Sequence, residues 1–315
     1  MPWLYYKNDA IMSETFRITF LGTSAAVPTV RRNVSATLVA YQDLKWLIDC
    51  GEGTQRQMVQ ANVGFRNLEH IVLSHEHLDH ILGIGGLLAT LNMLQPVEQV
   101  VVYGNPTVIE RVLQMTSYIG RAAQYNLHLQ VIEDGPVFTH RQLECFAFPT
   151  RHRVKHSYGF VFQEKPRRRF LAETATQLGV PNGPERRRLL AGDSLLLPDG
   201  RLVHPDAVLG PEEPGKKLVY ISDSQYFPEL STIAAGADCL ISEATFLHTD
   251  AALAAEAGHM TAAQAAMVAR DAGVQLLYLN HVSQRYAQCE HLLLEEARQI
   301  FANTHLAHDF DTIGV

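Results

Sequence analysis

The chain has 315 residues, of which 47% are hydrophobic and 19% charged, and its net charge is −7 at pH 7. This composition excludes a disordered chain, because disordered chains contain few apolar residues. The acidic balance argues against a protein that coats nucleic acid over its whole surface, although a local basic patch can still bind it.

Met1–Glu14 has neither the basic start nor the apolar stretch of a signal peptide, and no later segment resembles a membrane span. We therefore expect a cytoplasmic protein without membrane contact. Because α/β enzymes of this length commonly fold as one unit, we expect one catalytic domain over residues 1–315 with an inserted arm at 165–215. The four cysteines lack paired spacing, and we expect them to be reduced and mostly buried.

The order of apolar runs and breaking residues predicts alternating strands and helices. The predicted strands are Phe16–Leu21, Ser35–Tyr41, Lys45–Ile48, His70–Leu73, Val97–Tyr103, Leu127–Ile132, Leu143–Phe148, Tyr158–Gln163, Leu218–Ile221, Cys239–Ile241, Leu276–Leu279 and 309–315. The predicted helices are Gln55–Ala61, Ile81–Leu94, Pro106–Met115, Thr261–Ala272 and His291–Phe301. Thr54 and Thr261 are expected to cap two of them. This order predicts an α/β fold with two sheets packed between helices.

The stretch Ser74–His80 holds four possible metal ligands directly after an apolar strand. Side chains of extended backbone alternate between two sides, so His75 and His77 point the same way and can bind one cation. Asp79 and His80 follow where the chain turns into a helix, and from there they can reach a second cation. Imidazole and carboxylate donors suit zinc. The alternative is a polar turn with exposed histidines, but this ligand spacing rarely arises by chance.

Three further strands end in a potential ligand, namely His152, Asp223 and His281. Each residue alone has a simpler explanation: a polar turn residue, a turn former and a core histidine. Because ligands at strand ends meet on one rim of a sheet, the three are expected to complete the opening motif. Together they would supply three ligands to each metal, with Asp223 free to bridge.

Basic residues are concentrated between residues 165 and 188. This segment contains the acidic residues Glu173 and Glu185 and seven basic residues, namely Lys165, Arg167, Arg168, Arg169, Arg186, Arg187 and Arg188. Such a run is often only a solvated face, but phosphate backbones favour it through counterion release and arginine can also stack on RNA. The arm is therefore predicted to bind RNA.

Seven short motifs are distributed along the chain: Phe20–Thr23, Pro28 with Arg32 and Asn33, Asp49–Gln55, Ser74–His80, Gly179–Pro184, Glu243–Thr245 and His281–Tyr286. Together they resemble the motifs of ribonuclease Z, a family of transfer RNA 3′-processing endonucleases with the metallo-β-lactamase fold. The resemblance implies a four-layer αββα sandwich that cuts the 3′ trailer from precursor tRNA. The expected products are a 3′-hydroxyl on the tRNA and a 5′-phosphate on the trailer, and a homodimer is expected.

The resemblance also implies roles for individual residues. One zinc would take His75, His77 and His152, the other Asp79, His80 and His281, with Asp223 bridging; manganese or iron could replace zinc. The catalytic residues would be Asp79, Glu243 and His259, with the last two forming a relay that protonates the leaving oxygen. The substrate-binding residues would be Arg32, Asn33, Arg167, Arg168, Arg169, Gly183, Pro184, Arg186, Arg187, Arg188, Ser283 and Arg285.

The chain departs from the family pattern at several positions. An extra residue after the third ligand motif leaves His156 as a rival to His152. Ser242 and Met260 replace a usual histidine and serine, and Val30 replaces a lysine associated with sensing the CCA end, where Arg31 is a possible substitute. Two alternative functions are a small-molecule phosphodiesterase of the same fold, which has no need of a basic arm, and a non-catalytic RNA-binding protein.

Overall fold

The computed structural model describes residues 16–117 and 125–315, so the polar leader predicted for residues 1–14 lies outside the described residues. The chain forms two compact units. The main unit runs to His140 and continues through Glu144–Phe162 and Lys217–Val315, whereas the arm unit comprises Arg141–Leu143 and Gln163–Lys216. Within the described ranges, no helix combines the length and apolar character needed to cross a membrane.

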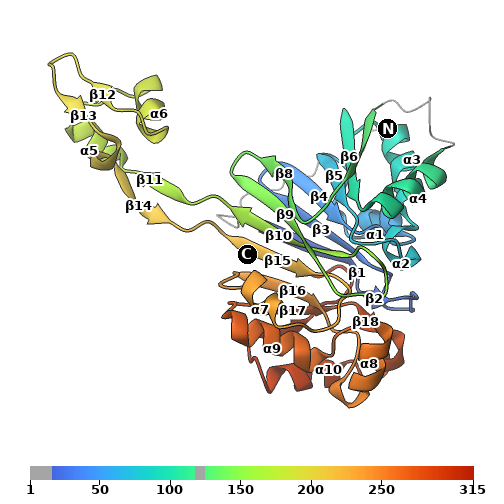
Figure 1. The fold of residues 1–315 in the computed structure, drawn as a ribbon. Helices are drawn as coiled ribbons and strands as arrows, with labels where there is room; N and C mark the ends of the chain where they lie inside the picture. The colour runs from blue at the N-terminus through green and yellow to red at the C-terminus, as the bar shows by residue number, and fades with distance from the viewer. Residues whose placement is uncertain (1–15, 118–124) are drawn as a thin grey trace. The chain divides into compact units, whose positions relative to one another are not determined.

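Two seven-stranded sheets lie at the centre of the main unit (Figure 1). The first has the order β20 (Thr312–Gly314), β1 (Phe16–Gly22), β3 (Ala36–Tyr41), β4 (Leu44–Ile48), β5 (Leu68–Val72), β6 (Gln99–Gly104), β7 (Asn126–Val131). The second has the order β19 (Thr304–Leu306), β17 (Leu277–Asn280), β16 (Cys239–Glu243), β15 (Lys217–Ile221), β10 (Tyr158–Glu164), β9 (Leu143–Pro149), β8 (Gly135–His140). A short parallel pair, β2 (Ser24–Ala25) and β18 (Val282–Ser283), lies outside both sheets.

Helices cover the outer face of each sheet (Figure 1). The first sheet carries α1 (Thr54–Gln60), α2 (Leu78–Ile81), α3 (Ile84–Leu94) and α4 (Pro106–Thr116), and the second carries α7 (Glu229–Ile233), α8 (Ala251–Ala257), α9 (Ala262–Ala272) and α10 (His291–Arg298). Between the sheets, Trp46 of β4 stacks on Phe162 of β10 with ring centroids 5.1 Å apart. Phe20 of β1 likewise contacts Tyr278 of β17 at 5.4 Å. The predicted αββα fold is therefore confirmed.

The helix ends test the predicted caps. Thr261 caps α9 as predicted, because its hydroxyl accepts from the backbone of Gln264 and the Gln264 side chain accepts in return. The cap predicted at Thr54 is wrong: α1 begins at Thr54 itself, Gly53 precedes it with φ 78°, and the Thr54 hydroxyl donates to the Gly51 carbonyl.

The helix predicted over Ile81–Leu94 is interrupted. Two helices, α2 and α3, replace it and meet at Gly83. Sequence periodicity also missed β8, β19, α7 and α8. β19 and α7 span only three and five residues, and β8 and α8 each bury a single residue, so none of the four has a recognisable apolar pattern.

The arm unit has a small hydrophobic core of its own. Its elements are β11 (Arg167–Phe170), α5 (Ala172–Gln177), α6 (Pro184–Leu190), β12 (Leu195–Leu196), β13 (Leu202–Val203) and β14 (Leu209–Glu213). The core contains Ala175, Val180, Leu189, Leu195, Leu197, Val203 and Val208. The unit includes the whole range predicted for the inserted arm, 165–215.

The junction between α2 and α3 has no room for a side chain. A Cβ atom on Gly83 would lie 2.0 Å from the Gly51 carbonyl oxygen. The same junction is joined to the Cys50 backbone by two hydrogen bonds, from Gly83 N to Cys50 O at 2.9 Å and from Cys50 N to His80 O at 2.7 Å. A glycine at this position therefore lets the turn after β4 pack against the segment that carries His80.

Replacing Gly83 with alanine should lower the free energy of unfolding by about 1–3 kcal/mol, because overpacking at a closely packed junction forces the backbone to shift. Thermal or urea unfolding measures the change. Gly210→Ala is the control, since its added methyl group meets no atom closer than 3.5 Å. Equal stability of the Gly83 variant and the native chain would contradict this account of the junction.

Candidate metal centre

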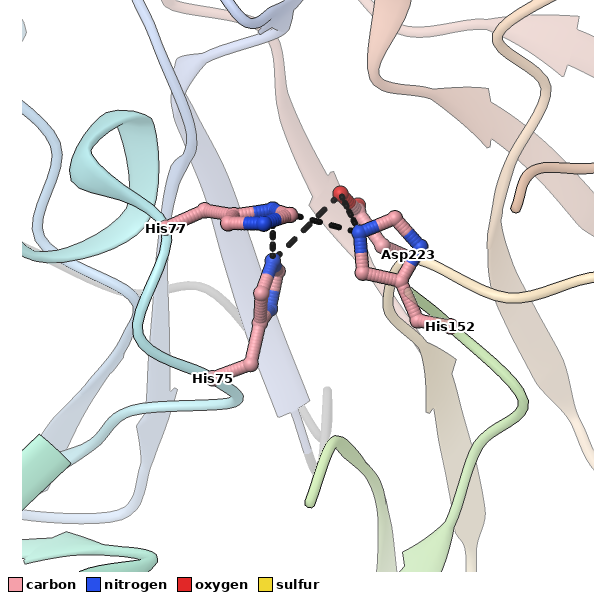
Figure 2. Close-up of side chains that lie close together, drawn as sticks. All are labelled: His75, His77, His152 and Asp223. Carbon is pink, nitrogen blue, oxygen red and sulfur yellow. Dashed lines mark hydrogen bonds and ion pairs between the residues drawn. The ribbon is translucent and has the colours of Figure 1, made fainter. Parts of the chain in front are cut away.

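Four side chains converge on one point in the main unit. Figure 2 shows His75 and His77, both from the extended segment after β5, facing His152 and Asp223. His77 Nδ1 lies 3.0 Å from His75 Nε2 and 3.2 Å from His152 Nε2. Asp223 Oδ2 lies 3.6 Å from His75 Nε2 and 3.8 Å from His152 Nε2. This geometry places His75 and His77 on one side, as the alternation of extended backbone predicts.

Hydrogen bonds determine which nitrogen of each ring faces the cluster. His152 Nδ1 lies 2.8 Å from the Gly258 carbonyl, which can only accept, so Nδ1 carries the proton and Nε2 keeps the lone pair. Ser74 Oγ lies 3.0 Å from Asp49 Oδ2 and 3.0 Å from His75 Nδ1. The hydroxyl donates to the carboxylate and accepts from His75, so His75 Nε2 also directs its lone pair into the cluster.

Burial keeps these rings neutral. It lowers the pKa of His75 well below the usual value, and the neighbouring His80 lowers it further. Burial also lowers the pKa of His77 and of His152. A neutral imidazole is the form that binds a metal ion, so the first cluster is ready to bind a cation at pH 7.

A second cluster contains Asp79, His80 and His281. His80 Nε2 lies 3.3 Å from His281 Nε2 and 3.5 Å from Asp79 Oδ2, and His281 Nε2 lies 3.4 Å from the same Asp79 oxygen. Asp223 Oδ2 is 3.4 Å from His80 Nε2. One carboxylate oxygen of Asp223 therefore contacts both clusters.

Asp49, directly after β4, orients the His80 ring by contacting its Nδ1 atom. Its Oδ2 lies 2.7 Å from His80 Nδ1, and its Oδ1 accepts from the Ser74 backbone at 2.8 Å. This carboxylate was not among the predicted site residues, although it follows an apolar strand just as the predicted ligands do. Burial disfavours protonation of His80, but Asp223, Asp79 and Asp49 outweigh it and raise the pKa of His80 well above the usual value.

The donors of both clusters fit divalent cations. A proton on His77 Nδ1 can satisfy only one of its two neighbouring nitrogens, so the first cluster keeps unpaired lone pairs that a cation would satisfy. The buried Oδ1 of Asp223 has no hydrogen-bond partner among the described residues. Burial favours the neutral acid at Asp223, but His281 and His80 lower its pKa well below the usual value, so it is ionised. Nitrogen and carboxylate donors of this kind suit zinc.

The buried Glu243 and the partly buried His259 form a pair beside the clusters. His259 Nδ1 lies 2.9 Å from Glu243 Oε1, which also accepts from the Ser224 backbone at 2.8 Å. The other carboxylate oxygen accepts from the Thr245 hydroxyl at 2.7 Å. Burial favours the neutral ring, but the Glu243 carboxylate outweighs it and raises the pKa of His259 to about 9. His259 is therefore protonated at neutral pH.

Several predicted residues lie outside the clusters. His156 is exposed, so the structure places His152 and not its rival among the donors. Arg32 is buried, with 5% of its surface exposed, and pairs with Glu290 at 2.8 Å. It also donates to the Thr23 hydroxyl at 2.6 Å. Its guanidinium is therefore held inside the main unit, and its contact with substrate stays a prediction.

The other residues predicted to contact substrate near the clusters differ in their surroundings. Asn33 is partly buried, and its Nδ2 donates to the Glu52 carbonyl at 2.8 Å. Ser283 accepts from the Arg285 backbone, whereas the Arg285 side chain is exposed. Val30, which replaces the family lysine, is fully exposed.

The arm arginines fall into two groups. Arg168 donates to the carbonyls of Gly210 and Leu209 and pairs with Asp206, and Arg186 donates to the Thr176 hydroxyl at 2.8 Å. Arg167 is exposed at 3.9 Å from Glu213. Arg169, Arg187 and Arg188 are exposed and form no ion pair within the described part of the chain. Gly183 and Pro184, at the start of α6, are exposed as well.

Comparisons with known proteins extend over nearly the whole chain. Residues 16–178 match the family model described as anti-Pycsar protein Apyc1, and residues 207–282 match the beta-lactamase superfamily domain. The solved structure of human tRNase Z, short form, has a TM-score of 0.68 at 23% identity and covers 95% of this chain and 99% of its own. A diphosphatase of the PhnP family has a TM-score of 0.64 at 18% identity, covering 95% and 97%. These structures support the fold alone.

Curated relatives establish the family. A protein of Bradyrhizobium diazoefficiens named Ribonuclease Z is 43% identical over 302 residues, which cover 95% of this chain and 100% of the relative. A protein of the same name from Archaeoglobus fulgidus is 40% identical and covers 95% of this chain and 98% of its own length. The chain therefore belongs to the ribonuclease Z family, within the metallo-β-lactamase fold.

Proposed function

We propose that this chain is a zinc-dependent endoribonuclease that cuts the 3′ trailer from precursor tRNA. It leaves a 3′-hydroxyl on the tRNA and a 5′-phosphate on the trailer. The observation that carries the proposal is the convergence of seven donors on two clusters that share Asp223, in a chain 43% identical to a relative named Ribonuclease Z. Manganese or iron is compatible with the same donors.

The first site would hold its cation with His75, His77 and His152, the second with Asp79, His80 and His281, and Asp223 would bridge. Two bound divalent cations supply an activated water and charge stabilisation for the attacking and leaving oxygens of a phosphodiester. Asp79 is assigned to catalysis as well as to metal binding. Its Oδ2 accepts from the Ala26 backbone at 2.8 Å, which holds the carboxylate at the second site.

His259 would protonate the leaving 3′ oxygen. Its Nδ1–H is directed at Glu243, so its Nε2–H remains available to a substrate oxygen. Glu243 in turn is held by the Ser224 and Thr245 backbone N–H groups at 2.8 and 3.2 Å. A proton donor oriented in this way typically contributes about 10²–10⁴-fold to the rate.

The metal content of two variants tests the bridge. The native chain should bind close to two zinc ions. Asp79→Ala should weaken chiefly one site, because that carboxylate contacts only the second cluster, whereas Asp223→Ala should weaken both. Elemental analysis after dialysis against limiting zinc measures the difference. If the Asp223 variant lost one ion only, the bridging role would be wrong.

The pH dependence of cleavage tests the pair of His259 and Glu243. The acid must be protonated, so the rate should fall as pH rises through the pKa of His259, which is about 9. In Glu243→Gln the carboxylate that raises this pKa is gone, and the alkaline limb should therefore move to lower pH. Single-turnover rates on precursor tRNA between pH 6 and pH 10 measure the shift.

His259→Ala is the control for that experiment. It should reduce cleavage of RNA by about 10²–10⁴-fold and leave zinc content unchanged. An aryl phosphodiester, whose leaving group needs no proton, should be cleaved at nearly the native rate. An equal loss on both substrates would show that His259 holds the structure or the metal and is no acid.

A small-molecule phosphodiesterase is the alternative function, because it would use the same metal ligands. The arm unit distinguishes the two functions, because a small-molecule phosphodiesterase has no need of a basic arm. We infer that its exposed arginines bind the RNA phosphate backbone, and that Arg168 and Arg186 serve the fold of the unit instead. Three arginines with exposed side chains and no ion pair within the described residues, Arg169, Arg187 and Arg188, support this division.

Replacing Arg169, Arg187 and Arg188 together with alanine should weaken precursor tRNA binding. Each phosphate contact contributes about 0.7–0.9 to the slope of log affinity against log salt, so the slope should fall by about two to three. Hydrolysis of the aryl phosphodiester should persist, because all the metal donors belong to the main unit. Binding titrations at several salt concentrations measure the slope.

The charge-matched control replaces three exposed arginines of the main unit, Arg66, Arg111 and Arg270, which should leave the slope nearly unchanged. Unaltered affinity and slope in the arm variant would favour the small-molecule function. A homodimer and a cytoplasmic location belong to the same proposal, and the likeness to ribonuclease Z is their support.

A further inference from the structure

Thr245 lies between the second metal cluster and the pair of Glu243 and His259. It is buried two residues after Glu243, beyond the end of β16. Its Oγ1 lies 2.7 Å from Glu243 Oε2 and 3.1 Å from His281 Nδ1. The same atom lies 3.0 Å from the His281 carbonyl oxygen and 3.4 Å from His259 Nδ1. One hydroxyl therefore touches a metal-site histidine and both members of the acid pair.

The direction of these hydrogen bonds follows from the donor inventory. A threonine hydroxyl has one proton and two lone pairs. The Glu243 carboxylate is the nearest acceptor and carries charge, which strengthens a hydrogen bond, so the proton goes to Glu243. A lone pair of Oγ1 then accepts from His281 Nδ1–H. The chain of donation runs from His281 to Thr245 and from Thr245 to Glu243.

This direction sets the tautomer of His281. With the proton on Nδ1, the lone pair is on Nε2, which lies 3.3 Å from His80 Nε2 and 3.4 Å from Asp79 Oδ2. Asp223 Oδ1 lies 3.3 Å from His281 Nδ1 as well, but it accepts no hydrogen bond. Thr245 is therefore the side-chain hydrogen-bond partner of that nitrogen among the described residues.

His281 also has an unusual backbone conformation. His281 has φ 57°, a left-handed conformation that non-glycine residues adopt rarely. The residue stands between β17 and β18. Because the single hydroxyl proton of Thr245 goes to Glu243, the hydroxyl does not donate to the His281 carbonyl, and its hydrogen bond to His281 is made through the ring.

We propose that Thr245 is a positioning residue that directs His281 Nε2 toward the second cation and couples that site to Glu243 and His259. This inference rests on the proposed function. Neighbours of metal ligands that fix a histidine tautomer commonly change metal affinity by about 10- to 100-fold when removed. In this proposal Thr245 fixes the ring orientation of His281, as Asp49 does that of His80.

Three variants separate the hydroxyl from the shape of the side chain. Thr245→Val keeps the branched shape and removes the hydroxyl, whereas Thr245→Ser keeps the hydroxyl and removes the methyl group. Thr116→Val is the matched control, because Thr116 is a buried threonine on α4 whose hydroxyl donates to the Val112 carbonyl at 2.7 Å, away from every donor of the clusters. Thr245→Ala serves as the hydroxyl-free variant if the valine variant does not fold.

Zinc titration of the metal-free chain, followed by calorimetry or a chelating dye, measures the affinity of each site. We expect Thr245→Val to weaken one of two sites by about 10- to 100-fold and to leave the other as in the native chain. Thr245→Ser should stay within a few fold of native at both sites, as should Thr116→Val. Native affinity at both sites in the valine variant would overturn the inference. Equal weakening by serine and valine would also overturn it, because the methyl group would then be responsible.

Zinc-saturated enzyme tests the coupling to the acid pair. Thr245→Val should lose more activity on precursor tRNA than on the aryl phosphodiester, because only the RNA leaving group needs the proton from His259. Equal losses would overturn the coupling. Measurements on the native chain test the proposed function separately. If the native chain binds fewer than two zinc ions or leaves precursor tRNA intact, the proposed function itself is wrong, whatever the Thr245 variants show.

Discussion

A single buried carboxylate oxygen, Asp223 Oδ2, contacts both clusters of metal-binding side chains, and the arrangement of the site depends on it. It lies 3.4 to 3.8 Å from ring nitrogens of His75, His80 and His152, which belong to two separate clusters. A buried anion is costly unless positive charge compensates it, and burial keeps the rings of His75 and His152 neutral because it lowers their pKa. Bound cations provide that compensation, and the positions of the other donors follow from the need to face them.

The fold meets this need by bringing strand ends from both sheets to one place. His75, His77, Asp79 and His80 follow β5 of the first sheet, whereas His152, Asp223 and His281 follow strands of the second. Residues around them fix the rings: Asp49 holds His80, the Gly258 carbonyl holds His152, and Thr245 contacts His281. The donor His281 and the supporting residue Asp49 both have left-handed backbone, which turns the chain sharply where a strand ends.

Much of this arrangement could be predicted from the sequence. The alternation of His75 and His77 and the ligands at four strand ends predicted two groups of donors, because periodicity and strand endings are local properties. One rim of a single sheet was expected, but the donors come from two sheets, since nothing local in the sequence assigns a strand to a sheet. Asp49 and Thr245 were missed as site residues because their importance depends on partners 31 and 36 residues away. The burial of Arg32 was missed for the same reason: its partner Glu290 is distant in sequence.

The account depends most directly on two metal ions sharing Asp223. Crystals of the zinc-loaded chain, measured on both sides of the zinc absorption edge, would locate the ions by their anomalous scattering. The account predicts two peaks roughly 3.5–4 Å apart, as in other two-metal hydrolytic sites, with an Asp223 oxygen between them. A single peak, or two peaks of which only one contacts Asp223, would contradict it.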